Sequence, residues 1–124
     1  MKIGALMLAR SGSSFLNKNI IEINGYPVMA FGMLAAKETQ LIDHYYLSSD
    51  SDDYLTIGEE YGYGPIKRPD ILSKSSSKSD DAVLHAYQSN DILKECDILI
   101  VQHANVVTIY PELIIKSINI WYKD

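Results

Sequence analysis

Apolar runs alternate along the chain with polar loops and with segments of helical periodicity. The first run, Ile3 to Leu8, has the length and apolarity of a buried strand. The strongest strand signal is Asp97 to Gln102, in which four consecutive apolar residues are bounded by polar ones. Weaker signals predict strands at 20–23, at Asp43 to Ser48 and, briefly, at 64–67. These runs are the expected strands.

Helices are predicted between the strands from capping residues and apolar periodicity. Pro27 suits the first position of a helix that ends near residue 37. Ser51 can cap the next helix, whose first turn is acidic and which Gly62 ends. A third helix is expected to begin near Ser79, and a last one to run over 111–123.

Strands that alternate with helices predict an α/β fold, in which a mostly parallel sheet is joined by right-handed crossovers. With 124 residues, the chain is expected to form one domain with its own core. The carboxyl ends of the first, second and fourth strands of the expected sheet would lie at one edge. Parallel sheets place their ligands beyond this edge.

The loop between Leu8 and Asn19 is the main candidate for chemistry. Small and hydroxyl-bearing residues let backbone N–H groups approach an anion, while Arg10 and Lys18 supply positive charge for phosphate oxygens. The sequence therefore predicts a phosphate-binding loop, although an ordinary surface loop with two basic residues has the same composition. The small residues of the predicted site are Ser11, Gly12 and Ser13.

Further polar residues follow the other strands and are expected at the same edge as Arg10 and Lys18. They are Asp50, Arg68 and Gln102. Asp50 could orient Arg10 or a nucleotide hydroxyl, and His103 lies where it could touch a ligand. The serine-rich segment 73–79 is either a mobile part of the site or a solvated connection, and its composition favours the connection.

Composition narrows the classes of function. A net charge of −5 argues against a general binder of nucleic-acid polymers, which needs a basic face. The single cysteine, Cys96, cannot form an internal disulfide and predicts a core thiol in a reducing cytoplasm. No apolar run approaches the ~20 residues of a membrane span. His44 and His85 have no close partner at metal-ligand spacing, so structural roles are expected for both.

The last predicted helix carries more apolar surface than one sheet face requires. Ile114, Ile118 and Trp121 form one stripe, and further apolar residues, including Ile115 and Ile120, widen it. This surplus predicts either a homodimer or association with a partner through the C-terminal helix.

The order of the polar motifs resembles the cytidylyltransferases that make CMP-activated acidic sugars, such as CMP-sialic acid synthetases. The resemblance covers nearly all 124 residues, but only about the N-terminal half of a typical member. It implies a three-layer, nucleotidyltransferase-type (Rossmann-like) fold with helices on both faces of the sheet. The motifs that carry it are Ala9-Arg10-Ser11-Gly12-Ser13, Lys18-Asn19, Ser48-Ser49-Asp50-Ser51, Arg68-Pro69, Val83-Leu84-His85-Ala86 and Gln102.

The resemblance also implies a reaction and roles for residues. A sugar hydroxyl would attack the α-phosphorus of CTP and release pyrophosphate, with Mg²⁺ as cofactor. Arg10 and Lys18 would contact the triphosphate, and Ser13 and Asn19 would help to fix the nucleotide. Arg68 and Gln102 would lie near the base and the sugar acid.

Two departures from the family pattern leave other functions open. Ser14 or Phe15 stands where relatives carry a basic residue, and Gln102-His103-Ala104-Asn105-Val106 replaces Gln-Pro-Thr-Ser-Pro. The family's metal-binding carboxylates and dimerisation element belong to the half that the resemblance does not cover. Two alternatives therefore stand. One is a non-catalytic nucleotide-binding or assembly fragment, and the other is a KDO-type or other sugar nucleotidyltransferase.

Overall fold

The computed structural model describes residues 1–10, 22–23, 25–69 and 79–104. Outside the described residues lie residues 11–19 of the predicted phosphate loop, the serine-rich segment before Ser79 and the last predicted helix. The strands are β1 (Ile3–Ala9), β2 (Glu22–Ile23), β3 (Tyr26–Pro27), β4 (His44–Ser49), β5 (Gly64–Lys67) and β6 (Ile98–His103), and the helices are α1 (Val28–Glu38), α2 (Asp52–Glu60), α3 (Ser79–Ser89) and α4 (Asp91–Lys94).

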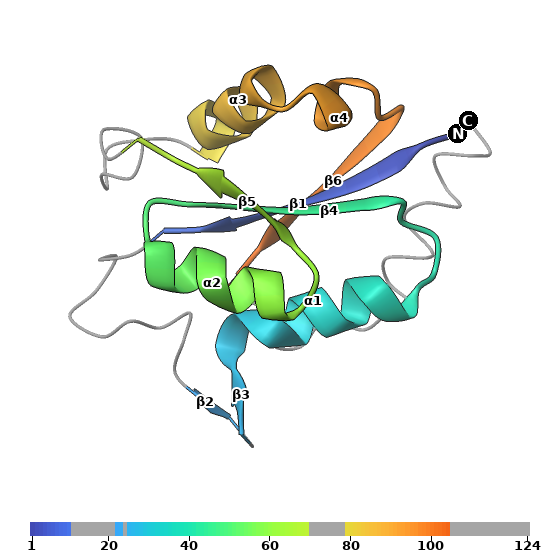
Figure 1. The fold of residues 1–124 in the computed structure, drawn as a ribbon. Helices are drawn as coiled ribbons and strands as arrows, with labels where there is room; N and C mark the ends of the chain where they lie inside the picture. The colour runs from blue at the N-terminus through green and yellow to red at the C-terminus, as the bar shows by residue number, and fades with distance from the viewer. Residues whose placement is uncertain (11–21, 24, 70–78, 105–124) are drawn as a thin grey trace.

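Four strands form one parallel sheet in the order β5-β4-β1-β6. Helices α1 and α2 cover one face of this sheet, and α3 and α4 cover the other, which gives three layers (Figure 1). The predicted parallel sheet with helices on both faces is therefore confirmed. β2 and β3 form a separate antiparallel hairpin. Pro27 was predicted as the first residue of a helix, but it belongs to β3, where it pairs with Glu22. Helix α1 begins at the next residue.

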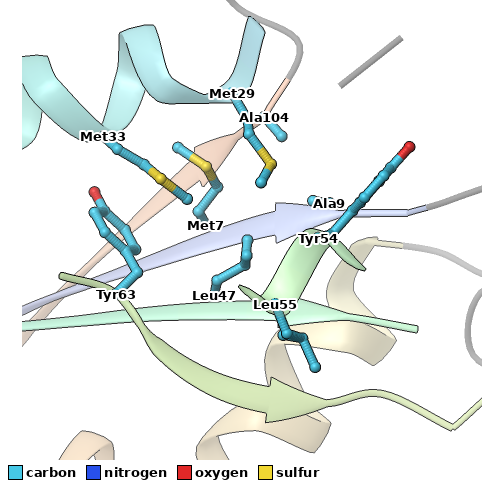
Figure 2. Close-up of a cluster of buried hydrophobic side chains, with 9 residues drawn as sticks. All are labelled: Met7, Ala9, Met29, Met33, Leu47, Tyr54, Leu55, Tyr63 and Ala104. Atoms are coloured by element: carbon cyan, nitrogen blue, oxygen red, sulfur yellow. The ribbon is translucent and has the colours of Figure 1, made fainter. Parts of the chain in front are cut away.

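The core lies on both faces of β1, whose seven residues are all buried. Met7 and Ala9 pack into the cluster under α1 and α2, which Figure 2 shows together with Met33, Leu47 and Tyr63. Leu6 and Leu8 face the other way, into a cluster with Ala82, Ala86 and Leu93 of α3 and α4. Because both faces are apolar, β1 has the continuous apolar sequence that predicted a buried strand.

Two aspartates fix the start of β1 against its neighbours. The Ile3 N–H donates to Asp43 Oδ2 at 2.8 Å, and the Lys2 N–H donates to Asp97 Oδ2 at 2.9 Å. The backbone N–H groups of Asp43 and Asp97 donate in return to the carbonyls of Ile3 and Lys2, both at 2.8 Å. These four hydrogen bonds join both neighbouring strands to β1 at one end of the sheet and set the register there.

The predicted cap of the second helix is confirmed. Ser51 is the N-cap of α2, and its hydroxyl accepts a hydrogen bond from the Tyr54 N–H at 3.3 Å. Asp52 and Asp53 lie in the first turn, where carboxylates favour the positive end of the helix dipole. Gly62 follows the helix with a φ of +83°, a conformation that glycine adopts without steric cost. The Ser51 cap therefore fixes the turn that joins the end of β4 to the start of α2.

Cys96 is half-buried rather than fully inside the core. Burial raises the pKa of its thiol, with Asp43 adding to the effect, so the side chain stays protonated and unreactive. This agrees with a structural role for the cysteine.

Replacing Gly62 with alanine should destabilise the fold more than the same change at Gly25. Both glycines have positive φ, +83° and +84°, so both substitutions carry backbone strain of about 1–2 kcal/mol. At Gly62 the new methyl group also meets the Lys37 ammonium, which lies 4.3 Å from the centre of the Tyr45 ring, whereas nothing lies within 4 Å at Gly25. Urea denaturation should show about 0.5–1 kcal/mol of additional loss at Gly62, the value of a cation–π contact. Equal losses at the two glycines would contradict this account.

Candidate functional site

The carboxyl ends of the four parallel strands meet at one edge of the sheet. Ala9 pairs with Ser49, Ser49 with Lys67, and Leu8 with His103, so these strands end side by side. The residues that follow immediately belong to this edge as well. The structure therefore brings three of the predicted site residues together, namely Arg10, Asp50 and Arg68.

Arg68 is held firmly at this edge. It is only 4% exposed, which is unusual for an arginine. Its Nε donates to Ser48 Oγ and its Nη2 donates to the Ser48 carbonyl, both at 3.1 Å, while its backbone N–H donates to the Ser49 carbonyl at 2.8 Å. The end of β4 thus holds the guanidinium in one orientation. The sequence pointed to Arg68 but gave no signal for Ser48 as its partner.

Asp50 and Arg10 both act on the charge of Arg68. Burial lowers the pKa of the Arg68 guanidinium, the Asp50 carboxylate opposes this shift, and the positive charge of Arg10 adds to it. An arginine keeps its proton at neutral pH even so. Arg10, Arg68 and Asp50 thus place two positive charges and a carboxylate close enough to interact at this edge. Such an arrangement can receive an anion and orient it.

Lys67 also belongs to this edge, and sequence reasoning did not select it. Its Nζ donates to the Asp50 carbonyl at 2.9 Å and to Asp52 Oδ1 at 2.8 Å. The contact depends on the register of β4 and β5, which sequence periodicity does not show. Lys67 thus contacts the turn after β4, and Arg68, the next residue, contacts the end of β4 itself.

Gln102 lies on the opposite face of the sheet from Leu8 and is 5% exposed. Its Oε1 accepts a hydrogen bond from the Tyr63 hydroxyl at 2.6 Å, and its Nε2 donates to the Gly32 carbonyl at 3.0 Å. Burial raises the pKa of the Tyr63 hydroxyl, which therefore stays protonated and donates. The amide thus has partners inside the protein at both ends. Its expected contact with a ligand stays a prediction.

The predicted roles of Ser11, Gly12, Ser13, Lys18 and Asn19 fall outside the described residues and stay predictions. His103 is exposed at the end of β6, beside Leu8. His44 and His85 are half-buried in β4 and α3. Within the described ranges, no group of three or more His, Cys, Asp or Glu side chains is placed to hold a metal ion. None of the described helices is long and apolar enough to cross a membrane.

Two curated proteins show what the sequence is similar to. It is 34% identical over 86 residues to N-acylneuraminate cytidylyltransferase of Escherichia coli O18:K1:H7, a match that covers 68% of this chain and 20% of the relative. It is 33% identical over 101 residues to a Helicobacter pylori protein named as a pseudaminic acid cytidylyltransferase and a UDP-2,4-diacetamido-2,4,6-trideoxy-beta-L-altropyranose hydrolase, covering 79% of this chain and 19% of the relative. The chain thus spans about a fifth of the length of either protein.

Solved structures show the same fold. A CMP:2-keto-3-deoxy-manno-octonic acid synthetase, solved in complex with CTP, superposes with a TM-score of 0.84 at 18% identity. The match covers 100% of this chain and 48% of the synthetase chain. A cytidylyltransferase from Leptospira borgpetersenii serovar Hardjo-bovis gives a TM-score of 0.76 at 15% identity, over 100% of this chain and 50% of its own. The expected nucleotidyltransferase-type fold is confirmed.

The comparison with family models covers almost the whole sequence. The model described as cytidylyltransferase matches residues 5–120, which include every strand of the parallel sheet except the first two residues of β1. Arg10, Asp50 and Arg68 all lie within the matched region. The chain therefore belongs to the cytidylyltransferase family.

Proposed function

We propose that the protein transfers CMP from CTP to an acidic sugar of the nonulosonic class and releases pyrophosphate. One observation carries this proposal. In a chain of the cytidylyltransferase family, Arg10, Asp50 and the buried Arg68 are grouped at the sheet edge where parallel α/β folds bind their ligands.

The grouped residues suit a reaction that depends on positioning and charge neutralisation. The anomeric hydroxyl oxygen of the sugar would form a bond to the α-phosphorus and release its proton to water, and the bond from that phosphorus to the leaving pyrophosphate oxygen would break. Arg10 would neutralise phosphate charge, and Arg68 would orient the nucleotide or the sugar carboxylate. Asp50 would orient Arg10 or accept a hydrogen bond from a nucleotide hydroxyl.

The predicted loop completes this proposal. Lys18 would add a second charge to the triphosphate, and Asn19 would fix the nucleotide with the loop's small residues, Ser11, Gly12 and Ser13. Gln102 would support the site from within the protein, because its amide is hydrogen-bonded to Tyr63 and Gly32. We therefore assign it a positioning role within the proposal.

Mg²⁺ fits the described residues only as an ion carried on the CTP phosphates. Magnesium is commonly bound by substrate phosphates together with one or two carboxylates. Asp50 is a carboxylate at this edge, but the described ranges hold no group of three or more candidate ligands. The roles proposed here for Arg10, Arg68 and Asp50 do not depend on the metal.

The sugar is proposed as a class. The two curated relatives are named for N-acylneuraminate and pseudaminic acid, and the solved synthetase is named for 2-keto-3-deoxy-manno-octonic acid. A KDO-type sugar is therefore an alternative acceptor. A cytoplasmic location and a homodimer formed through residues 111–123 belong to the same proposal.

A second candidate function stands beside the transferase. The chain spans about half of the solved cytidylyltransferases and about a fifth of the first curated relatives. Groups that complete a catalytic site can lie in the remainder of such proteins. A nucleotide-binding domain without turnover, or one that assembles with another subunit, is consistent with this coverage.

Calorimetry and a pyrophosphate assay separate the two candidates. We expect CTP with Mg²⁺ to bind with a dissociation constant in the range of about 1 μM to 1 mM, which is typical of enzyme substrates. ATP serves as the matched nucleotide control and should bind at least several-fold more weakly. Pyrophosphate released with a nonulosonic acid or KDO supports the transferase and identifies the acceptor. Binding without release supports the second candidate, and a folded protein that binds no CTP rejects both.

A further inference from the structure

The turn between β4 and α2 is held from two sides by consecutive residues at the end of β5. Arg68 contacts Ser48 from within the protein, through Nε and Nη2. Lys67 contacts the turn from outside, and its side chain is 53% exposed. Its Nζ lies 2.9 Å from the carbonyl oxygen of Asp50 itself. The two basic residues therefore hold the backbone on both sides of the Asp50 carboxylate.

The rest of the turn leaves Asp50 little freedom. The Ser51 N–H donates to Ser49 Oγ at 3.1 Å, and the Tyr54 N–H donates to Ser51 Oγ at 3.3 Å. The carboxylate of Asp52 forms an ion pair with Lys67 at 2.8 Å. Asp50 is then the carboxylate of this turn that interacts with Arg68.

We infer that Lys67 is a positioning residue, which fixes the Asp50 backbone so that its carboxylate faces Arg10 and Arg68. This inference rests on the proposed function, in which these three groups receive CTP. Lys67 acts through Asp50 and not as a phosphate ligand. Its other partner, Asp52, is 87% exposed, and exposed ion pairs contribute little to stability. The hydrogen bond to the Asp50 carbonyl is the contact through which Lys67 would position Asp50.

A double-mutant cycle tests this role, because removing any positive charge near the site also weakens the binding of an anion. CTP affinity is measured by calorimetry for the wild type, Lys67→Met, Asp50→Asn and the double variant. We expect Lys67→Met to weaken binding about 3–10-fold in the wild type, and less than about twofold when Asp50 is already asparagine. Lys67→Arg should restore most of the affinity, because a guanidinium can donate to the same carbonyl.

Lys94→Met is the matched control. Lys94 also forms an ion pair, with Asp91 at 3.7 Å, and its side chain is 45% exposed, but it lies in α4. Its replacement should change CTP affinity by less than about twofold. An undiminished effect of Lys67→Met in the Asp50→Asn background would show that Lys67 acts by charge alone, and would overturn the inference. No effect of Lys67→Met in the wild type would also overturn it.

Hydrogen exchange in the free protein separates this inference from the proposed function. The Ser51 N–H is held within the turn, so Lys67→Met should accelerate its exchange several-fold and leave the β1 amides unchanged. If the wild type binds no CTP, the proposed function fails, and the exchange rate still decides whether Lys67 holds the turn. An unchanged Ser51 rate would overturn the positioning role whatever CTP does.

Discussion

Replacing Tyr63 with phenylalanine is expected to lower the free energy of unfolding by about 1–3 kcal/mol, the cost of leaving a buried polar group without its partner. The Tyr63 hydroxyl donates to Gln102 Oε1 at 2.6 Å, and both residues are almost completely buried. Phenylalanine keeps the ring among Met7, Met33 and Leu47, where Figure 2 shows it, so the packing changes little. Urea denaturation measures the loss directly.

Tyr87→Phe is the matched control for this substitution. Tyr87 is 41% exposed, so loss of its hydroxyl should change the free energy of unfolding by less than about 0.5 kcal/mol. Combining Tyr63→Phe with Gln102→Leu removes both members of the buried pair. The double variant should lose less stability than the sum of the single variants. A Tyr63→Phe protein as stable as the wild type would show that the hydrogen bond contributes nothing.

Replacing Arg68 with methionine is expected to weaken CTP binding at least tenfold, which corresponds to about 1.4 kcal/mol. The guanidinium is held by Ser48 through two hydrogen bonds at 3.1 Å and is grouped with Arg10 and Asp50. Charge-assisted hydrogen bonds from a preoriented arginine are among the stronger polar contacts that a ligand can make. Calorimetry with CTP measures the loss, and circular dichroism shows whether the variant is folded.

Arg68→Lys separates charge from geometry. Lysine keeps the positive charge, but its single ammonium group lacks the planar fork that contacts both Ser48 atoms. We expect its CTP affinity to lie between those of the wild type and Arg68→Met. A folded Arg68→Met protein with wild-type affinity would remove Arg68 from the proposed site and leave Arg10 as its described cation.

Much of the fold follows from local sequence signals. The apolar run at Ile3 to Leu8 predicted the inner strand β1, and the run at Asp97 to Gln102 predicted its neighbour β6. Ser51 and the acidic residues after it predicted the start of α2. Parallel strand order then placed Arg10, Asp50 and Arg68 at one edge. These features depend on periodicity, caps and chain order, which a single sequence contains.

The features that sequence reasoning missed depend on short elements or on distant contacts. β3 has two residues and α4 has four, too few to show a period. Tyr63 and Gln102 are 39 residues apart, and neither carries a signal for the other. Lys67 meets the Asp50 carbonyl only because Ser49 and Lys67 share a register position. Such contacts become visible once the strands are paired.

The central place of β1 has a consequence for synthesis of the protein. β1 is made first, but the hydrogen bond from Lys2 to Asp97 spans 95 residues, whereas that from Ile3 to Asp43 spans 40. On the ribosome, β1 can therefore pair with β4, and β4 with β5, while β6 is still unmade. At ordinary rates of translation, the time between the synthesis of β5 and that of β6 is on the order of a few seconds. Until β6 is made, β1, the most apolar of the described strands, has an unpaired edge, and such edges promote aggregation.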